Sequence, residues 1–293
     1  MKNSPIFFFL LCSLATHAQE DLLKELDKES ESTPDFAAAT FKGTRLINGQ
    51  TVETKGKGEL EFIFAHRFGP INGGWYELFG LDQAYTRLGL EYGITDKMGV
   101  GFGRNSVDKT WDTYVRYKLL RQSKGSRVMP FTVTAFGIAA VKTSPKKEDA
   151  TYDIQLQDRM SYAGQLLIAR KVNSNLSLQL MPSIVHKNTV DKTIEKNDQV
   201  ALGVGGRLKV SRSVALTTEY YYRFDVQDGN PYYNPLGFGV DIETGGHVFQ
   251  LVMTNSRGLT ERAYLTETAD DFFKGAIHLG FNITRTFQMK KQK

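Results

Sequence analysis

The sequence has very little cysteine. Its single cysteine, Cys12, lies in an apolar stretch at the N-terminus, Ile6–Leu14, which is typical of a secretory signal. The mature chain is therefore expected to have no disulfide and no thiol chemistry. No other stretch approaches the ~18 consecutive apolar residues of a membrane-spanning helix. If the chain crosses a bilayer, it must do so as a closed β-barrel, because lipid offers no partners to an open backbone.

Charge of one sign and metal-binding motifs are also scarce. The formal net charge is +5 over 293 residues, and basic residues are scattered among acidic ones, so no nucleic-acid partner is predicted. No H-E-x-x-H spacing occurs. The Gly-x-Gly runs at Gly99–Gly103 and Gly203–Gly206 lie within predicted strands rather than at a strand-to-helix turn. We therefore predict no cofactor and no metal site.

Four histidines remain after removal of the signal: His66, His186, His247 and His278. His66 and His278 lie on strands that become neighbours when a barrel closes, but they fall on opposite faces, which disfavours a shared metal site. A lipid or peptide hydrolase would need a serine within reach of a histidine. No outward serine accompanies His66 or His186, so no catalytic residue is predicted.

The chain is rich in segments where apolar side chains alternate strictly with polar or small ones. In Val200–Phe224, one face carries apolar residues such as Val204 and Leu216, and the other carries glycine and charged residues such as Arg207 and Glu219. A period of two predicts β-strands. A soluble barrel would bury the apolar face, whereas a membrane barrel turns it to lipid and lines its lumen with the polar one.

The same rhythm recurs along most of the chain and predicts an all-β, antiparallel, up-and-down transmembrane barrel of about twelve strands. The predicted strands are Leu60–Phe68, Ala84–Ile94, Met98–Arg104, Trp111–Leu120, Val128–Val141, Met160–Val172, Leu176–His186, Val200–Val210, Val214–Phe224, Leu236–Glu243, His247–Asn255 and Ala276–Phe287. Pro130 and Pro182 fall inside two of them, and a bulge or a strand end is expected at each. Counting Thr40–Thr54 as two further strands would give fourteen.

Short and long connections alternate between these strands, as expected for short periplasmic turns and longer extracellular loops. The predicted organisation is a signal peptide (1–18) cleaved near Ala18, an N-terminal segment that is periplasmic or a plug (19–58), the barrel (59–288) and a tail (289–293). The longest connection, Ser256–Gly275, mixes apolar and charged residues. It is either a solvated loop or an inward-folded plug or ligand contact.

The predicted lumen is lined by charged residues of both signs. Such groups would select a small solute in an open channel, or would pair with one another and fill a narrow interior. The lumen-lining candidates are Arg87, Glu91, Asp112, Arg116, Lys118, Arg207, Lys209, Glu219, Arg223, Asp241, Glu243 and His278.

Several local strings resemble an uncharacterised family of Gram-negative outer-membrane barrels, the domain of unknown function 5777 family. They are Thr40–Gln50, Tyr76–Asp82, Arg87–Asp96, Leu166–Lys171, Asp241–Leu251 and Thr254–Leu259. The resemblance implies a barrel in the outer membrane and brings no activity or catalytic residue. The last predicted strand ends in Phe287, which is similar to the signal read by the barrel-assembly machinery.

The leading functional prediction is a non-enzymatic outer-membrane barrel that passes or binds a small solute or supports the envelope. Its expected partners are outer-membrane lipids, the barrel-assembly machinery and that solute. Two alternatives stay open at this point: an outer-membrane lipid or peptide hydrolase, and a secreted soluble β-barrel.

Overall fold

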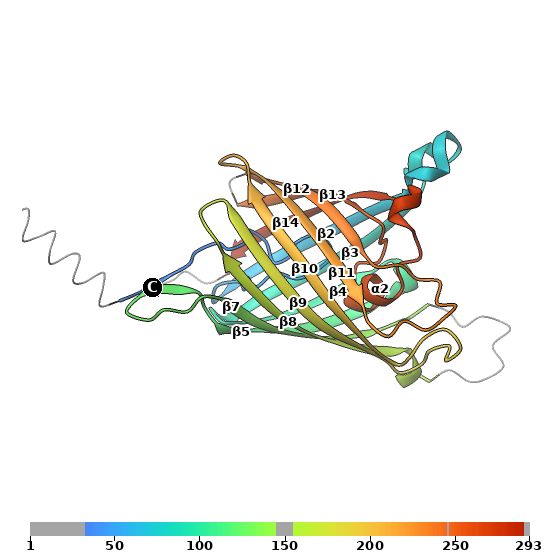
Figure 1. The fold of residues 1–293 in the computed structure, drawn as a ribbon, viewed down its shortest axis with the longest axis horizontal. Helices are drawn as coiled ribbons and strands as arrows, with labels where there is room; N and C mark the ends of the chain where they lie inside the picture. The colour runs from blue at the N-terminus through green and yellow to red at the C-terminus, as the bar shows by residue number, and fades with distance from the viewer. Residues whose placement is uncertain (1–32, 145–154, 245, 290–293) are drawn as a thin grey trace, which may run out of the picture.

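The structure is a computed structural model that describes residues 33–144, 155–244 and 246–289. The predicted signal peptide, residues 19–32 of the predicted N-terminal segment and residues 290–293 of the predicted tail lie outside this part of the chain. The described residues form a closed antiparallel barrel with a small two-stranded sheet beside one of its ends (Figure 1).

Twelve strands make the barrel wall, each paired with the next along the chain, and the last strand closes on the first. The strands are β2 (Glu59–Pro70), β3 (Ala84–Thr95), β4 (Met98–Asn105), β5 (Trp111–Leu120), β7 (Thr132–Val141), β8 (Met160–Lys171), β9 (Leu176–Lys187), β10 (Asp198–Lys209), β11 (Val214–Arg223), β12 (Leu236–Thr244), β13 (His247–Thr254) and β14 (His278–Gln288). The prediction of a twelve-stranded antiparallel barrel is therefore confirmed.

The two prolines behave differently from each other. Pro130 lies before β7, which begins at Thr132, so the predicted start at Val128 was wrong and the expected strand end is present. Pro182 lies inside β9, paired in register with Leu202, so no strand end or register shift occurs there. On its other side the β8–β9 ladder breaks between Gln165–Ser183 and Ile168–Leu180, as expected where a residue has no N–H to donate.

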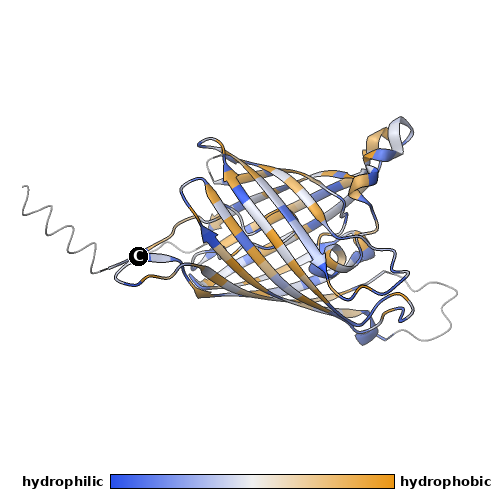
Figure 2. Cartoon of the chain, in the orientation of Figure 1, coloured by the Kyte–Doolittle hydropathy of each residue, from blue (hydrophilic) through white to orange (hydrophobic). Residues whose placement is uncertain are grey.

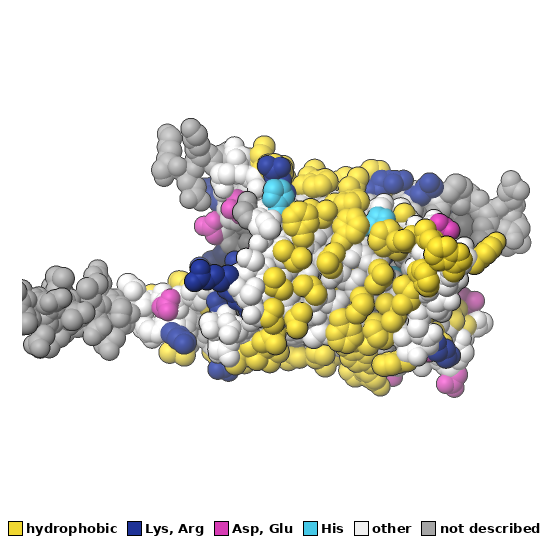
Figure 3. Space-filling model, turned by 90° about the horizontal axis from the view of Figure 1, so that it is seen from above, with side chains coloured by type: hydrophobic (Ala, Val, Ile, Leu, Met, Phe, Trp, Pro, Cys, Tyr) yellow, Lys and Arg dark blue, Asp and Glu magenta, His cyan; other side chains and the backbone are white. Residues whose placement is uncertain are grey.

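The apolar face of the wall points outward. Leu88, Phe102 and Val204 are 52%, 52% and 43% exposed, whereas Arg207 and Glu219 on the opposite face are 6% and 1% exposed. Hydrophobic and hydrophilic residues alternate along the strands (Figure 2), and on the face seen in Figure 3 hydrophobic side chains cover the wall while charged ones lie toward its ends. An apolar outer surface around a polar interior is stable in lipid and unfavourable in water.

The two ends of the barrel differ. Tight turns lie at one end, hereafter the short-turn end, where β1 (Pro34–Phe36) pairs with β6 (Ser123–Gly125) outside the wall. The long-loop end carries η1 (Ile71–Gly80), η2 (Val107–Lys109), η3 (Gln157–Arg159), α2 (Glu261–Thr266) and η4 (Phe272–Lys274). Within the described residues, no helix is long and apolar enough to span a membrane.

Candidate functional site

The lumen is occupied by residues 40–54, hereafter the N-terminal plug. The chain passes from β1 into the barrel and makes a small hairpin in which Leu46 N–H donates to Gly49 O and Thr51 N–H donates to Thr44 O. Leu46 and Val52 are 1% and 0% exposed. Strand pairing within this hairpin is limited to an isolated bridge between Arg45 and Gln50, and the hairpin does not join the wall, so the fourteen-strand alternative was wrong.

Glu219 on β11 holds the tip of the N-terminal plug. Its carboxylate accepts hydrogen bonds from the backbone N–H groups of Ile47, Asn48 and Gly49 at 3.2, 2.8 and 3.1 Å. Gly49 fits because its backbone lies against the wall: a Cβ there would lie 2.0 Å from the Tyr221 hydroxyl. A buried carboxylate that binds a row of amides is well satisfied, so this contact anchors the hairpin tip.

Two arginines of the wall also hold the N-terminal plug, one at its tip and one beyond it, through backbone carbonyl and side-chain amide oxygens. Arg67 on β2 donates to Ile47 O at 3.1 Å and to Asn48 Oδ1 at 3.0 Å. Arg116 on β5 donates to Glu53 O at 2.7 Å and to Gln50 Oε1 at 2.6 Å. Both guanidinium groups are 0% exposed, so withdrawal of the plug must bring water to the donors that it leaves.

A second segment, residues 255–268, fills the lumen from the long-loop end; we call it the loop plug. Every residue of α2 is buried, and Tyr264 packs on Tyr221 of the wall with 5.4 Å between ring centroids. A helix of one or two turns is unstable in water by itself, so its structure depends on this burial. The sequence left two alternatives for Ser256–Gly275, a solvated loop or an inward-folded plug. Residues 256–266 follow the inward-folded alternative, whereas Phe273, later in the same loop, is 88% exposed.

The two plugs touch each other inside the barrel. Gln50 of the N-terminal plug donates from Nε2 to Oε1 of Glu261 in α2 at 2.7 Å. Arg45 Nη1 lies 3.6 Å from the same oxygen. Glu261 is 0% exposed and Arg45 is 6% exposed. The contact therefore closes the lumen between the segments that enter from opposite ends.

An ion network ties the loop plug to the surrounding loops. Arg262 contacts Glu267 at 2.5 Å and Asp108 at 3.2 Å. Lys142 pairs with both carboxylates, at 3.5 and 3.1 Å, and Lys187 lies 3.5 Å from Glu267. Burial by itself raises the pKa of Glu267 and of Asp108, but the neighbouring cations more than offset it and hold both pKa values below their usual range.

The predicted lumen-lining residues lie on the inner face, and most of them are paired. Arg87 and Asp112 lie 2.5 Å apart, and Arg116 Nε lies 3.0 Å from Glu91. Lys118, Lys209 and Glu243 are only half-buried at the short-turn end. The nine that are nearly fully buried are Arg87, Glu91, Asp112, Arg116, Arg207, Glu219, Arg223, Asp241 and His278.

Four further pairings complete this inner face. Arg207 lies 2.5 Å from Glu243 and 3.8 Å from Asp241. Lys118 lies 3.8 Å from Glu53 of the N-terminal plug. Arg223 donates to the carbonyl of Tyr232. These contacts match the paired alternative for the lumen charges rather than an open, hydrated bore.

The histidines occupy separate places. His66 faces outward and stacks on Phe281 at 5.1 Å, whereas His278 faces inward, 2.9 Å from Asp270 and 2.7 Å from Phe68 O. His186 lies 2.7 Å from Asp198 at the long-loop end. Among the described residues, no group of three potential metal ligands comes together.

Sequence reasoning missed the plug residues that matter most here. Arg45, Gln50 and Glu261 lie in segments without a period of two, and no local pattern marks them. Arg67 follows the same alternation as Glu61 and could have been assigned to the lumen by extending the phase of β2.

A polar cleft of about 700 Å³ remains at the short-turn end, between the N-terminal plug and the wall. Two ion pairs cross or border it: Lys42 with Glu243 at 2.9 Å, and Lys55 with Glu61 at 2.6 Å. The cleft is the part of the lumen mouth that the plug leaves open, and its lining is suited to a hydrated polar solute.

Comparison with known proteins agrees with this geometry. The profile of a family described as "Membrane bound beta barrel domain (DUF5777)" matches residues 41–287. The chain belongs to this family. The match runs from the N-terminal plug to the last strand, so both plugs lie within the domain that defines the family. No curated protein matches the sequence.

Solved structures with similar folds are distant. They include the "KdgM porin" (TM-score 0.46, 9% identity, 78% of this chain and 99% of that chain covered). A COG4313 outer membrane channel from Pseudomonas putida F1 gives a TM-score of 0.47 at 13% identity, with 80% and 98% covered. The outer membrane phospholipase A from Escherichia coli gives 0.40 at 10% identity, with 77% and 92% covered. Similarities at this level carry no argument about function.

Proposed function

We propose that this protein is an outer-membrane barrel that passes a small polar solute when a plug leaves its lumen. The observation that carries the proposal is the polar attachment of the N-terminal plug. Its tip is held by Glu219 and Arg67, and the residues that follow the tip are held by Arg116. Hydrogen bonds of this kind can be exchanged for water at modest cost. The few buried apolar side chains of the plug, such as Leu46 and Val52, hold it closed in the resting state.

The connectivity of the N-terminal plug also supports a movable segment. It joins the wall only through Gly58, at the start of β2, and leaves the lumen at the same end toward β1. It can therefore withdraw through the short-turn opening without unthreading any strand. A barrel of twelve strands lies between eight-stranded barrels, which are filled by side chains, and open porins of about sixteen strands. The bore left behind would suit a small solute.

The proposed location and biogenesis follow from the same features. A secretory signal at residues 1–18 would direct the chain across the inner membrane, with the short-turn end periplasmic and the long loops extracellular. The final strand would be read by the barrel-assembly machinery, with Phe287 as its terminal aromatic residue. We propose no enzymatic activity.

The test is conductance in planar bilayers. Deletion of residues 40–54 is expected to convert a closed protein into one with steady conductance. A second variant guards against misassembly: Asn48→Cys with Thr254→Cys, whose native side chains lie 3.1 Å apart, joined by a short bifunctional thiol reagent. The linked protein should stay closed, and the same variant without the reagent should open at least as often as the wild type, because it lacks the hydrogen bond from Arg67 to the Asn48 side chain. If the deletion variant folds but does not conduct, the channel proposal is wrong.

The alternatives have distinct outcomes in the same preparation. Hydrolysis of labelled phospholipid by the wild type would favour an enzyme. Extraction from membranes by carbonate without detergent would favour a secreted barrel. A properly inserted deletion variant without conductance or hydrolysis would favour support of the envelope.

A further inference from the structure

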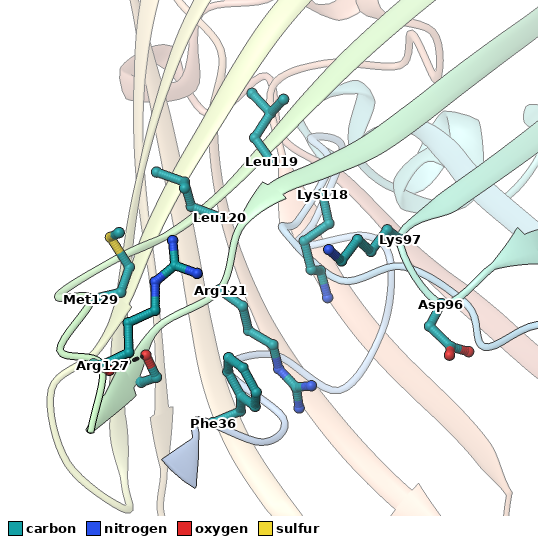
Figure 4. A pocket seen from close by; sticks show the side chains of 10 residues that line it. Phe36, Asp96, Lys97, Lys118, Leu119, Leu120, Arg121, Arg127 and Met129 are labelled. Carbon is teal, nitrogen blue, oxygen red and sulfur yellow. Dashed lines mark hydrogen bonds between the residues drawn. The ribbon is translucent and has the colours of Figure 1, made fainter. Parts of the chain in front are cut away.

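A second cleft lies at the short-turn end, outside the lumen. It has a volume of about 330 Å³ and is bounded by the β3–β4 turn, the end of β5, the β6 hairpin and β1. In the close-up, Lys97 extends from the turn, Lys118 and Arg121 from the end of β5, and Arg127 from the hairpin (Figure 4). Lys118 also lies 3.8 Å from Glu53 of the N-terminal plug, but Lys97, Arg121 and Arg127 have no part in the lumen-gating proposal.

The charge of this cleft is unbalanced. Four basic residues line it, against the single carboxylate of Asp96, which already accepts a hydrogen bond from Lys57 N–H at 2.9 Å. In the part of the chain that the structure describes, no carboxylate pairs with Lys97, Arg121 or Arg127, and Lys118 lies 3.8 Å from Glu53. The Arg121 guanidinium lies 4.7 Å from the Phe36 ring, which orients it without neutralising it. The cleft therefore offers cationic donors to an anion.

The other wall of the cleft is apolar and continues into the outer surface of the barrel. Leu119 and Leu120 line it and are 50% and 39% exposed. They follow Tyr117, an outward ring that is 46% exposed and typical of the interfacial girdle of a membrane barrel. Arg170 lies over the outward ring of Phe131 nearby, as expected where a cation reaches from the apolar belt toward headgroups. The cleft thus lies where the apolar belt ends.

We propose that this cleft binds the headgroup phosphate of an anionic membrane phospholipid. The phosphate would meet Arg121 and Arg127, with Lys97 and Lys118 adding charge, and the upper acyl carbons would lie on Leu119 and Leu120. A soluble phosphate would use the basic residues but not the leucines. A lipid is favoured because the basic side of the cleft is continuous with the apolar surface of the barrel. The site can be tested separately from lumen gating, because within the described residues Arg121 and Arg127 form no hydrogen bond or ion pair with the N-terminal plug, although Lys118 lies 3.8 Å from Glu53.

The test is native mass spectrometry of the full-length barrel purified with phosphatidylglycerol or with phosphatidylcholine. The double variant Arg121→Gln/Arg127→Gln should retain phosphatidylglycerol roughly thirtyfold less than the wild type, since each basic residue near an anionic headgroup contributes on the order of 1 kcal/mol. Its matched control is Lys124→Gln/Arg212→Gln, which removes two positive charges from the same end but outside the cleft. The control should retain phosphatidylglycerol like the wild type.

Two results would overturn the proposal. Equal loss of phosphatidylglycerol in both double variants would mean diffuse attraction to the rim. Equal retention of phosphatidylglycerol and phosphatidylcholine by the wild type would mean that the cleft does not select an anionic phospholipid. A third measurement distinguishes a lipid phosphate from a soluble phosphate. The variant Leu119→Glu should no longer retain phosphatidylglycerol, because it removes the apolar contact of the acyl carbons. If it does not, and inorganic phosphate displaces the lipid from the wild type, the ligand is a soluble anion and the lipid assignment fails.

Discussion

The backbone N–H of Asn48 donates a 2.8 Å hydrogen bond to the carboxylate of Glu219, although the two residues are 171 positions apart in the chain. The same carboxylate binds the amides on both sides of Asn48. One side chain of the wall therefore holds the tip of the N-terminal plug, and the strength of that attachment can be measured by changing it.

Glu219→Gln should loosen the plug without disturbing the wall. The neutral amide is a weaker acceptor and brings an extra donor that faces the backbone amides, so we expect attachment to weaken by about 2 kcal/mol. Amide hydrogen exchange at Asn48 and Gly49 should then accelerate by roughly thirtyfold. The matched control is Asp198→Asn, a carboxylate outside the lumen that is 67% exposed. Unchanged exchange in Glu219→Gln would show that the carboxylate does not anchor the tip.

Gly49→Ala should prevent the plug from seating. The added Cβ would lie 2.0 Å from the Tyr221 hydroxyl and 3.1 Å from the adjacent ring carbon, so the hairpin tip must move. We expect frequent channel openings in bilayers. Gly137→Ala on β7 is the control, because a Cβ there meets nothing within 4 Å.

A second substitution makes the steric cause of this effect testable. Tyr221→Phe removes the closest atom, so Gly49→Ala/Tyr221→Phe should open less often than Gly49→Ala alone. If the double variant opens as often as the single one, the hydroxyl contact is not what excludes the alanine.

Acid should release the loop plug. The pKa values of Asp108 and Glu267 are lowered in the folded state because Arg262 and Lys142 outweigh the effect of burial. The ionised network therefore contributes stability above about pH 4, the usual range of free carboxyls, and this contribution is lost as the pH falls through the folded-state values. Protease cleavage within residues 255–268 should become fast only in that acidic range.

The variant Glu267→Gln should show part of this release at neutral pH. It removes the partner of Arg262, Lys142 and Lys187 at once. Cleavage that is equally slow in the variant and the wild type at pH 7 would show that Glu267 does not hold the loop plug in place.

The strands and the two faces of the wall could be predicted because both follow from a period of two. Val204 and Leu216 outside, with Arg207 and Glu219 inside, are consequences of alternation alone. The two plugs could not be predicted in the same way. Residues such as Gln50 and Glu261 take their positions from partners 211 residues apart, and nothing in a local window encodes such a pairing.

Whether the charged lumen residues pair with one another could not be predicted either, because this also depends on residues that are distant in the sequence. Alternation places Glu91 and Arg116 on the same face of the sheet, but whether they bind each other or water depends on what else fills the bore. The structure adds the N-terminal plug, which takes up the remaining donors of Arg116.

The seam between β14 and β2 joins the two ends of the barrel sequence, with Leu60 opposite Phe287. The N-terminal plug directly precedes β2 in the chain. It binds Arg67 on β2 and Asn282 on β14, one on each side of the seam. The plug therefore bridges the two strands from inside the lumen, in addition to the backbone hydrogen bonds that pair them. When the plug withdraws, these polar groups exchange their contacts for water, so opening the lumen also removes a brace from the junction that closes the cylinder.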